Sequence, residues 1–187
     1  MSLLPLLLLF ALLGAAVWHD VRARRIPNAV VFPGALAALL LHALLPAGVG
    51  LFGTPAGGLG IGPALGGLGI GLAVLLPMYA LRLMGAGDVK LLAMVGAFVG
   101  AGQILTVALA TLIAGGVLAL AVAAWQGKLR YVLENARCMM LHSGVSAMGG
   151  SIVAPTGGTG RLPYAVAIAA ATVPCVLWLR VAGELPL

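Results

Sequence analysis

Residues 91–124 contain no charged side chain, and this run constrains the fold more than any other part of the sequence. It is too long for one membrane-crossing helix, which needs about 20 residues, and slightly short for two full crossings. Gly100 and Gly102 supply a natural turn within it. The run therefore predicts a short helix over residues 89–100 and a longer one over 103–125.

The remainder of the chain has the same apolar character. Of its 187 residues, 63% are hydrophobic and 7% are charged, and the mean hydropathy is +1.19. Soluble domains average about 25% charged residues, so this composition predicts a membrane protein. We expect one all-α membrane domain over residues 1–187, a polytopic helix bundle. Its six predicted transmembrane spans are 3–19, 29–45, 61–83, 89–100, 103–125 and 163–182.

The positions of the basic residues predict the orientation of this bundle. With the N-terminus outside and six crossings, nine of the ten Lys and Arg residues fall on one side: Arg22, Arg24, Arg25, Arg82, Lys90, Lys128, Arg130, Arg137 and Arg161. Basic loops are typically cytoplasmic, so we assign that side, with the loop 126–162, to the cytoplasm. Part of that loop has apolar residues at helical spacing, which predicts a helix on the membrane surface. The net charge of +6 then reflects these loops, and we expect no nucleic acid partner.

The sequence offers no sign of a metal or cofactor site. Its two cysteines, Cys138 and Cys175, do not form a CxxC pair, which excludes a cysteine-based zinc site. The three histidines, His19, His42 and His142, are scattered along the chain. We therefore predict no metal and no cofactor.

Asp20 and Asp88 are the only aspartates in the chain. Asp20 follows the first apolar run and opens a basic loop, whereas Asp88 begins the short helix, and the predicted topology puts both on the cytoplasmic side. An ionised aspartate in a membrane costs roughly 2.5–3.5 kcal/mol, and two neighbouring carboxylates lower this cost by sharing a proton. Such a half-protonated pair suits acid–base hydrolysis of a peptide bond, so the two aspartates are candidate catalytic residues.

The neighbours of Asp88 support this interpretation. In the motif Gly85-Ala-Gly-Asp-Val-Lys90, the two glycines, Gly85 and Gly87, permit close approach of another segment. Asp88 at a helix start can accept backbone N–H bonds, and Asn28 can cap the second helix in the same way. Lys90 is a candidate for orienting the substrate or tuning Asp88, although a lysine that extends to the membrane surface is the commoner case.

Other interpretations of the same residues stay open. Asp20 beside Arg22, Arg24 and Arg25 also fits a solvated ion-pair cluster, and Asp88 with Lys90 fits a simple helix cap. A small transporter that relays protons or binds a cation through both acids is a second possible function, and a non-catalytic assembly component is a third. Transport relays usually need acids along a path through the membrane, whereas both acids here fall at helix ends.

Three blocks of the sequence resemble the type IV prepilin peptidases, polytopic aspartic proteases of the GxGD class. The blocks are Asp20-Val-Arg-Ala-Arg-Arg-Ile-Pro-Asn28, Gly85-Ala-Gly-Asp-Val-Lys-Leu-Leu92 and Gly160-Arg-Leu-Pro-Tyr-Ala165. The resemblance implies that Asp20 and Asp88 are the catalytic pair, supported by Gly85, Gly87 and Lys90. It implies prepilin or pseudopilin substrates, whose basic leader is cut at the cytoplasmic face of the bacterial inner membrane.

Two further expectations come with this resemblance. Pro163 and Tyr164 are candidates for a substrate groove near the catalytic ends, although entry into a helix alone explains the proline. Longer family members carry an amino-terminal cysteine cluster associated with N-methylation, and this chain has none. It resembles the short, peptidase-only form of Tad/Flp pilus systems, so we do not expect methyltransferase activity. The sequence does not specify the oligomeric state.

Overall fold

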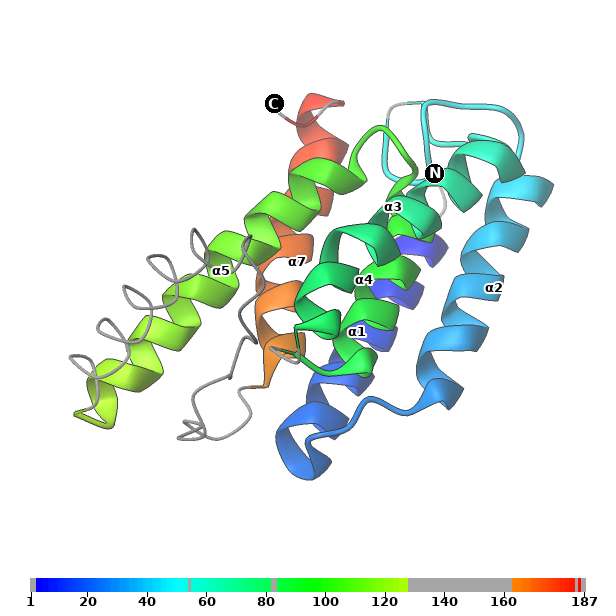
Figure 1. Cartoon of the computed structure of the whole chain (residues 1–187). Coiled ribbons are helices and arrows are strands. Elements are labelled where there is room, and N and C mark those ends of the chain that lie inside the picture. The colour runs from blue at the N-terminus through cyan, green and yellow to red at the C-terminus, as the bar shows by residue number, and fades with distance from the viewer. Residues whose placement is uncertain (1–2, 54, 82–83, 128–162, 184, 186–187) are drawn as a thin grey trace, which may run out of the picture. The chain divides into compact units, whose positions relative to one another are not determined.

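The computed structural model describes residues 3–53, 55–81, 84–127, 163–183 and 185. These residues form the following helices (Figure 1): α1 (Leu4–Ala23), α2 (Asn28–Leu44), α3 (Ile61–Ala80), α4 (Ala86–Val99), α5 (Ile104–Trp125) and α7 (Tyr164–Ala182). The prediction of an all-α protein is confirmed. The predicted surface helix in the loop 126–162 lies outside the described residues.

The described residues belong to two compact units. The first contains residues 3–115 together with 163–185, and residues 116–127 are the described part of the second. The first unit holds α1 to α4, the beginning of α5, and α7. Both predicted catalytic residues lie in this unit.

Helix α4 is the centre of the first unit. Every residue from 91 to 99 is buried, and α4 contacts α1, α2, α3 and α7. Figure 1 shows it passing between these helices. A helix that is hydrophobic on all sides is stable where protein or lipid covers every side, and the neighbouring helices provide this cover for α4. This burial explains why residues 91–99, the first part of the charge-free run 91–124, carry no charge.

The outer helices instead expose apolar side chains. On α2, Phe32, Leu36, Leu40 and Leu44 follow one another every four residues and are 57%, 58%, 49% and 79% exposed. An apolar stripe of this extent is unfavourable in water and suits the interior of a bilayer. Among the described residues, four helices are long and apolar enough to cross a membrane, namely α1, α3, α5 and α7. The protein is therefore a membrane protein, while the predicted six crossings and their orientation stay a prediction.

Glycines allow α3 and α4 to pack with their backbones in close contact. A Cβ atom on Gly67 would collide with the carbonyl oxygen of Gly96, and one on Gly71 would lie 2.7 Å from the carbonyl oxygen of Leu92. Small residues at such crossings let membrane helices approach more closely than larger residues permit. Gly67 and Gly71 thus allow this close packing.

Two predicted helix ends need correction. Helix α1 continues to Ala23, so Asp20 lies in its last turn and does not open a loop. Helix α2 begins at Asn28, but Pro27 occupies the N-cap position and no side chain caps this helix. The predicted capping role of Asn28 is wrong, because its Oδ1 atom instead accepts a hydrogen bond from Lys90.

The turn between α4 and α5 is confirmed. Helix α4 ends at Val99, and Gly100 follows with φ of 84°, a conformation that favours glycine. Beside this turn, His42 of α2 is buried between two backbone groups. Its Nδ1 atom accepts the N–H of Leu59 at 3.0 Å, which leaves Nε2, 3.2 Å from the carbonyl oxygen of Phe98, as the donor to α4.

Gly67→Ala tests the backbone contact between α3 and α4. The added methyl group must push the helices apart, and such overpacking costs about 1–3 kcal/mol. Gly69→Ala is the matched control, because a Cβ there meets nothing within 4 Å and alanine favours the helix. We expect thermal unfolding in detergent at a lower temperature for Gly67→Ala alone. Equal stability of the two variants would contradict the packing described here.

Candidate active site

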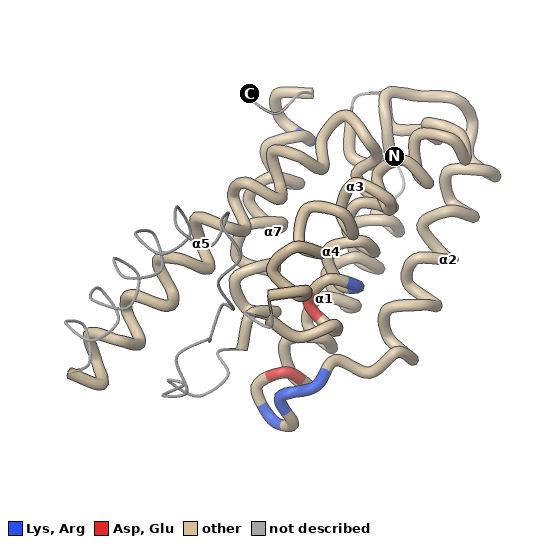
Figure 2. The backbone as a smooth tube through the Cα atoms, in the orientation of Figure 1, with Lys and Arg blue, Asp and Glu red and all other residues tan. Residues whose placement is uncertain are grey.

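Asp20 and Asp88 come together at one end of the helices of the first unit. Figure 2 shows acidic segments at the carboxyl end of α1 and near the amino end of α4, close to a group of basic segments. Helices α1 and α4 are in contact, and both acids are buried, with exposed fractions of 7% and 9%. The solvated ion-pair cluster considered for Asp20 therefore does not hold. The two acids share one buried region.

The Asp20 carboxylate is bound by the amino end of a distant helix. Its Oδ2 atom accepts a buried hydrogen bond of 3.1 Å from the backbone N–H of Ala165, the second residue of α7. The first N–H groups of a helix have no partner within that helix, and the helix dipole favours negative charge beside them. Asp20 thus satisfies one of these groups, across 145 positions of the sequence. Sequence reasoning missed this bond, although the third motif block contains Ala165.

The Asp88 carboxylate is bound within its own helix start. Asp88 is the third residue of α4, and its Oδ2 atom accepts the backbone N–H of Gly85 at 3.3 Å. In return, the N–H of Asp88 donates to the carbonyl oxygen of Gly85 at 3.2 Å. The prediction that Asp88 accepts backbone N–H bonds at a helix start is confirmed.

Asp88 precedes the apolar segment of α4, and its surroundings favour its protonated form. Burial raises the pKa of Asp88 to about 6, and the negative charge of Asp20 contributes in the same direction. The N–H of Gly85 lowers the pKa and offsets part of this increase. The two acids are thus close enough for the charge on Asp20 to disfavour a second charge on Asp88.

The two motif glycines leave room around Asp88. A Cβ on Gly87 would lie 3.1 Å from the Cβ of Ile26, in the connection between α1 and α2. A Cβ on Gly85 would lie 3.3 Å from the carboxylate of Asp88 itself. A larger residue at position 87 would press on the connection that follows α1, and one at position 85 would crowd the Asp88 carboxylate. The contact with Ile26 was not predicted, because only the folded chain brings residues 26 and 87 together.

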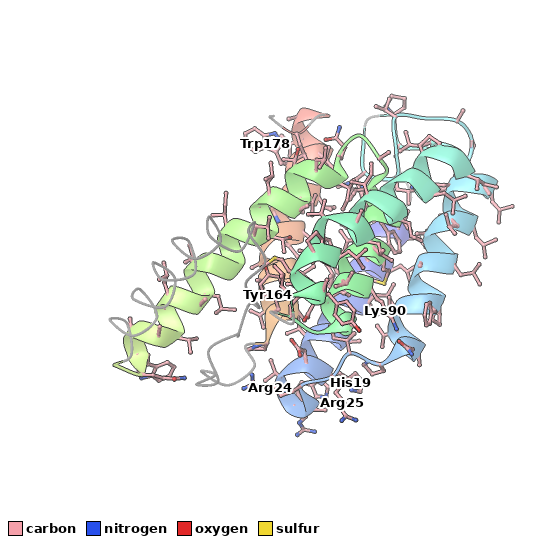
Figure 3. The ribbon with its side chains drawn as sticks, viewed as in Figure 1. His19, Arg24, Arg25, Lys90, Tyr164 and Trp178 are labelled. Carbon is pink, nitrogen blue, oxygen red and sulfur yellow. The ribbon has the colours of Figure 1, made fainter. Side chains whose placement is uncertain are left out.

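Lys90 is directed towards α2. Its Nζ atom donates to Oδ1 of Asn28 at 3.1 Å and lies 5.4 Å from the centre of the Phe32 ring. Figure 3 shows the side chain on the α2 side of the bundle. Lys90 therefore links α4 to α2, and its predicted influence on substrate or on Asp88 stays untested.

Basic and aromatic side chains surround the end of α1. The guanidinium group of Arg22 stacks on Trp18 at 4.5 Å, and the backbone N–H of Arg24 donates to the carbonyl oxygen of Asp20. Figure 3 places Arg24, Arg25 and His19 at this end. The side chain of His19, next to Asp20 in the sequence, is exposed. The site therefore lies at a strongly basic end of the first unit.

Pro163 and Tyr164 lie at the start of α7, next to the residue that binds Asp20. Pro163 is the N-cap residue. The Tyr164 hydroxyl donates to the carbonyl oxygen of Thr111 at 3.5 Å, and its ring lies so close to Gly115 that a Cβ there would collide with it. The structure thus places both residues at the site, while their role in a substrate groove stays a prediction. The described residues include no group of three or more His, Cys, Asp or Glu side chains that could hold a metal ion.

A helical membrane protein with two buried aspartates brought together at helix ends has the features of an intramembrane aspartic peptidase. Comparison with protein families agrees, because the model of the type IV leader peptidase family matches residues 7–120, more than half of the chain. The chain belongs to this family and is an aspartic prepilin peptidase. Neither the curated proteins nor the solved structures contain a match. The family match includes Asp20 and Asp88 and ends before α7.

Asp20→Asn should lower the pKa of Asp88, because it removes a nearby negative charge. The chain has only two aspartates, so labelling aspartate with ¹³C at the carboxyl carbon yields two NMR signals, and Asp20→Asn leaves one. We expect this signal to titrate near pH 6 in the parent protein and at lower pH in the variant. An unchanged midpoint would show that the two carboxylates do not interact.

Proposed function

We propose that Asp20 and Asp88 are the catalytic pair with which this peptidase cuts the basic leader from type IV prepilin-like substrates. Membership of the leader peptidase family implies prepilin substrates. The observation that carries the residue assignment is that the chain's two aspartates, 68 positions apart, are buried in one region. One carboxyl group holds a proton for the scissile carbonyl oxygen, and the other is ionised and takes a proton from the attacking water.

We propose further that cleavage takes place at the cytoplasmic face of the bacterial inner membrane. The basic side chains around the end of α1 support this, because basic segments of membrane proteins are retained in the cytoplasm. A prepilin-like substrate has a basic leader followed by an apolar helix. The helix would enter from the bilayer, and the peptide bond before it would then reach the end of the bundle where the acids lie.

The same two aspartates would also serve the alternative function, a proton- or cation-coupled transporter. Both acids lie at one end of the helices, and α4 beyond Asp88 contributes only apolar side chains, apart from Lys90, which is directed to α2. A path through the membrane would need polar groups along its length. The geometry therefore favours hydrolysis.

Asp20→Asn and Asp88→Asn should each abolish leader removal, with a loss of at least about a hundredfold, because each removes one proton-transfer group. The assay follows a co-expressed prepilin by its shift on a gel, with equal amounts of each peptidase variant in the membrane. Glu134→Gln is the control, because it neutralises an acid outside the proposed pair. Normal processing by either asparagine variant would end the proposal.

The rate of cleavage should fall as the pH rises above about 6. Below that pH Asp88 retains the proton that the reaction needs, and each further pH unit removes about nine-tenths of the protonated form. Purified peptidase in lipid nanodiscs and a synthetic prepilin peptide measure kcat/KM between pH 4.5 and 8. The basic side chains of the peptide do not titrate in this range. A value of kcat/KM that rises from pH 6 to 8 would contradict the expected protonation.

A further inference from the structure

The hydrogen bond from Ala165 to Asp20 has a consequence for the reaction. It connects a proposed catalytic residue on α1 to a helix that lies beyond the family match, which ends at residue 120. The bond is buried, and Asp20 is buried as well, so water does not compete for the carboxylate oxygen. Helix α7 therefore belongs to the site, through its backbone.

The two acids occupy different surroundings. Asp20 accepts the N–H of Ala165 at 3.1 Å and brings a charge to the amino end of a long helix of 19 residues. Asp88 accepts the N–H of Gly85 at a longer 3.3 Å, and Gly85 precedes its own short helix of 14 residues. An N–H donor at a helix start binds a carboxylate more strongly than a neutral carboxyl group. The bond to Asp20 is buried, whereas the bond to Asp88 is only partly buried, so the backbone donor stabilises negative charge more on Asp20 than on Asp88.

We propose that the first turn of α7 assigns the roles of the catalytic pair. Its backbone N–H keeps Asp20 as the carboxylate that activates water, and Asp88 then serves as the acid. Ala165 is then a positioning residue, which acts through Asp20. This inference rests on the proposed function and adds to it the assignment of the two roles. The raised pKa of Asp88 agrees with this assignment.

The resulting reaction balances in two steps. In the first, water attacks the scissile carbonyl carbon and gives one proton to Asp20, while Asp88 gives its proton to the carbonyl oxygen, which produces a gem-diol. In the second, the carbon–nitrogen bond breaks, Asp20 passes its proton to the leaving nitrogen, and one hydroxyl of the gem-diol returns a proton to Asp88. The products are a carboxylic acid and an amine, and both aspartates regain their initial states.

Tyr164 keeps the first turn of α7 in the required rotation. Its ring lies against Gly115 of α5, and its hydroxyl donates to the carbonyl oxygen of Thr111 on the same helix. Since Tyr164 immediately precedes Ala165, these contacts direct the Ala165 N–H towards Asp20. The contacts of Tyr164 with α5 therefore act on Asp20 through the peptide unit between Tyr164 and Ala165.

Other ionisable groups also border this end of the site. They are His19, Arg22, Arg24 and Arg25 at the end of α1 and after it, Lys90 on α4, Tyr79 on α3 and Tyr164 on α7. Lys90 is engaged by Asn28, and Arg22 stacks on Trp18. The basic residues after Asp20 favour the same distribution of charge, so the test must separate their influence from that of Ala165.

Aspartate-selective ¹³C NMR tests the assignment of roles in the intact protein. Asp20→Asn and Asp88→Asn each remove one of two signals and thereby assign them. At pH 5 in the parent protein, we expect the Asp20 signal at the carboxylate position and the Asp88 signal at the carboxylic acid position. The reverse arrangement, or two signals of the same kind, would overturn the proposal. If both asparagine variants still cleave prepilin, the proposed function itself fails, so the two failures are distinguishable.

Ala165→Pro tests the hydrogen bond directly. Proline is tolerated in the first turn of a helix and lacks the N–H that binds Asp20. Val166→Pro is the matched control, because the N–H of Val166 donates to the carbonyl oxygen of Pro163 instead. We expect kcat to fall about tenfold or more in Ala165→Pro with KM nearly unchanged, and the acid limb of its pH profile to move to higher pH. Equal effects of the two variants, or an unmoved limb, would overturn the role of Ala165.

A second matched pair covers the case in which the proline variants do not fold. Gly115→Ala forces the Tyr164 ring to move, whereas a Cβ on Gly116 meets nothing within 4 Å. We expect Gly115→Ala to reduce kcat and to move the acid limb in the same direction as Ala165→Pro, and Gly116→Ala to match the parent protein. If the two glycine variants have the same kinetics, the proposed path from α5 to Asp20 is wrong.

Discussion

The burial of α4 on every side is the constraint on which the rest of the structure depends. This helix has 14 residues, and all from 91 to 99 are buried. So short and apolar an element needs a complete shell of other helices, which α1, α2, α3 and α7 provide. Glycines at the α3 crossing make the shell tight, because side chains there would hold the backbones apart. The surrounding helices also determine the position of Asp88, the one acid of α4, because Asp88 lies in the first turn of this helix.

The same enclosure supports the proposed chemistry. Asp88 is nearly as buried as the apolar residues that follow it, and the loss of water raises its pKa into the range where it can hold a proton. Asp20 of α1 lies in the same region, and the backbone N–H of Ala165 in α7 compensates the loss of water around its carboxylate. A pair of carboxyl groups with unequal surroundings can carry unequal protonation at one pH. Catalysis by such a pair needs no metal, only a difference between the two environments.

Much of this arrangement could be predicted from the sequence, for physical reasons. Among the described helices, α2, α3, α4, α5 and α7 follow the apolar runs closely, because length and hydropathy decide which segments can enter a bilayer. Asp20 and Asp88 stood out because carboxylates are rare in such a chain. What could not be predicted depends on contacts between distant segments. Charge suggested a loop at Asp20, yet α1 continues to Ala23, since the carbonyl of Asp20 still finds a donor in the N–H of Arg24. Ala165 acts through a backbone N–H, which is identical in every residue except proline, so no residue type could reveal it.

His42 gives α4 a second fixed point, far from the acids. Its ring accepts the N–H of Leu59 and donates to the carbonyl oxygen of Phe98, ten residues beyond Asp88, or about 15 Å along a helix. A helix held at its far end cannot slide along its axis without breaking that bond. The depth of Asp88 relative to Asp20 is therefore set partly at the opposite end of the bundle. The bond from His42 to Phe98 thus fixes the axial position of α4, and with it the distance between the two carboxyl groups. Because Leu59 orients the His42 ring, this distance depends on the connection between α2 and α3 as well.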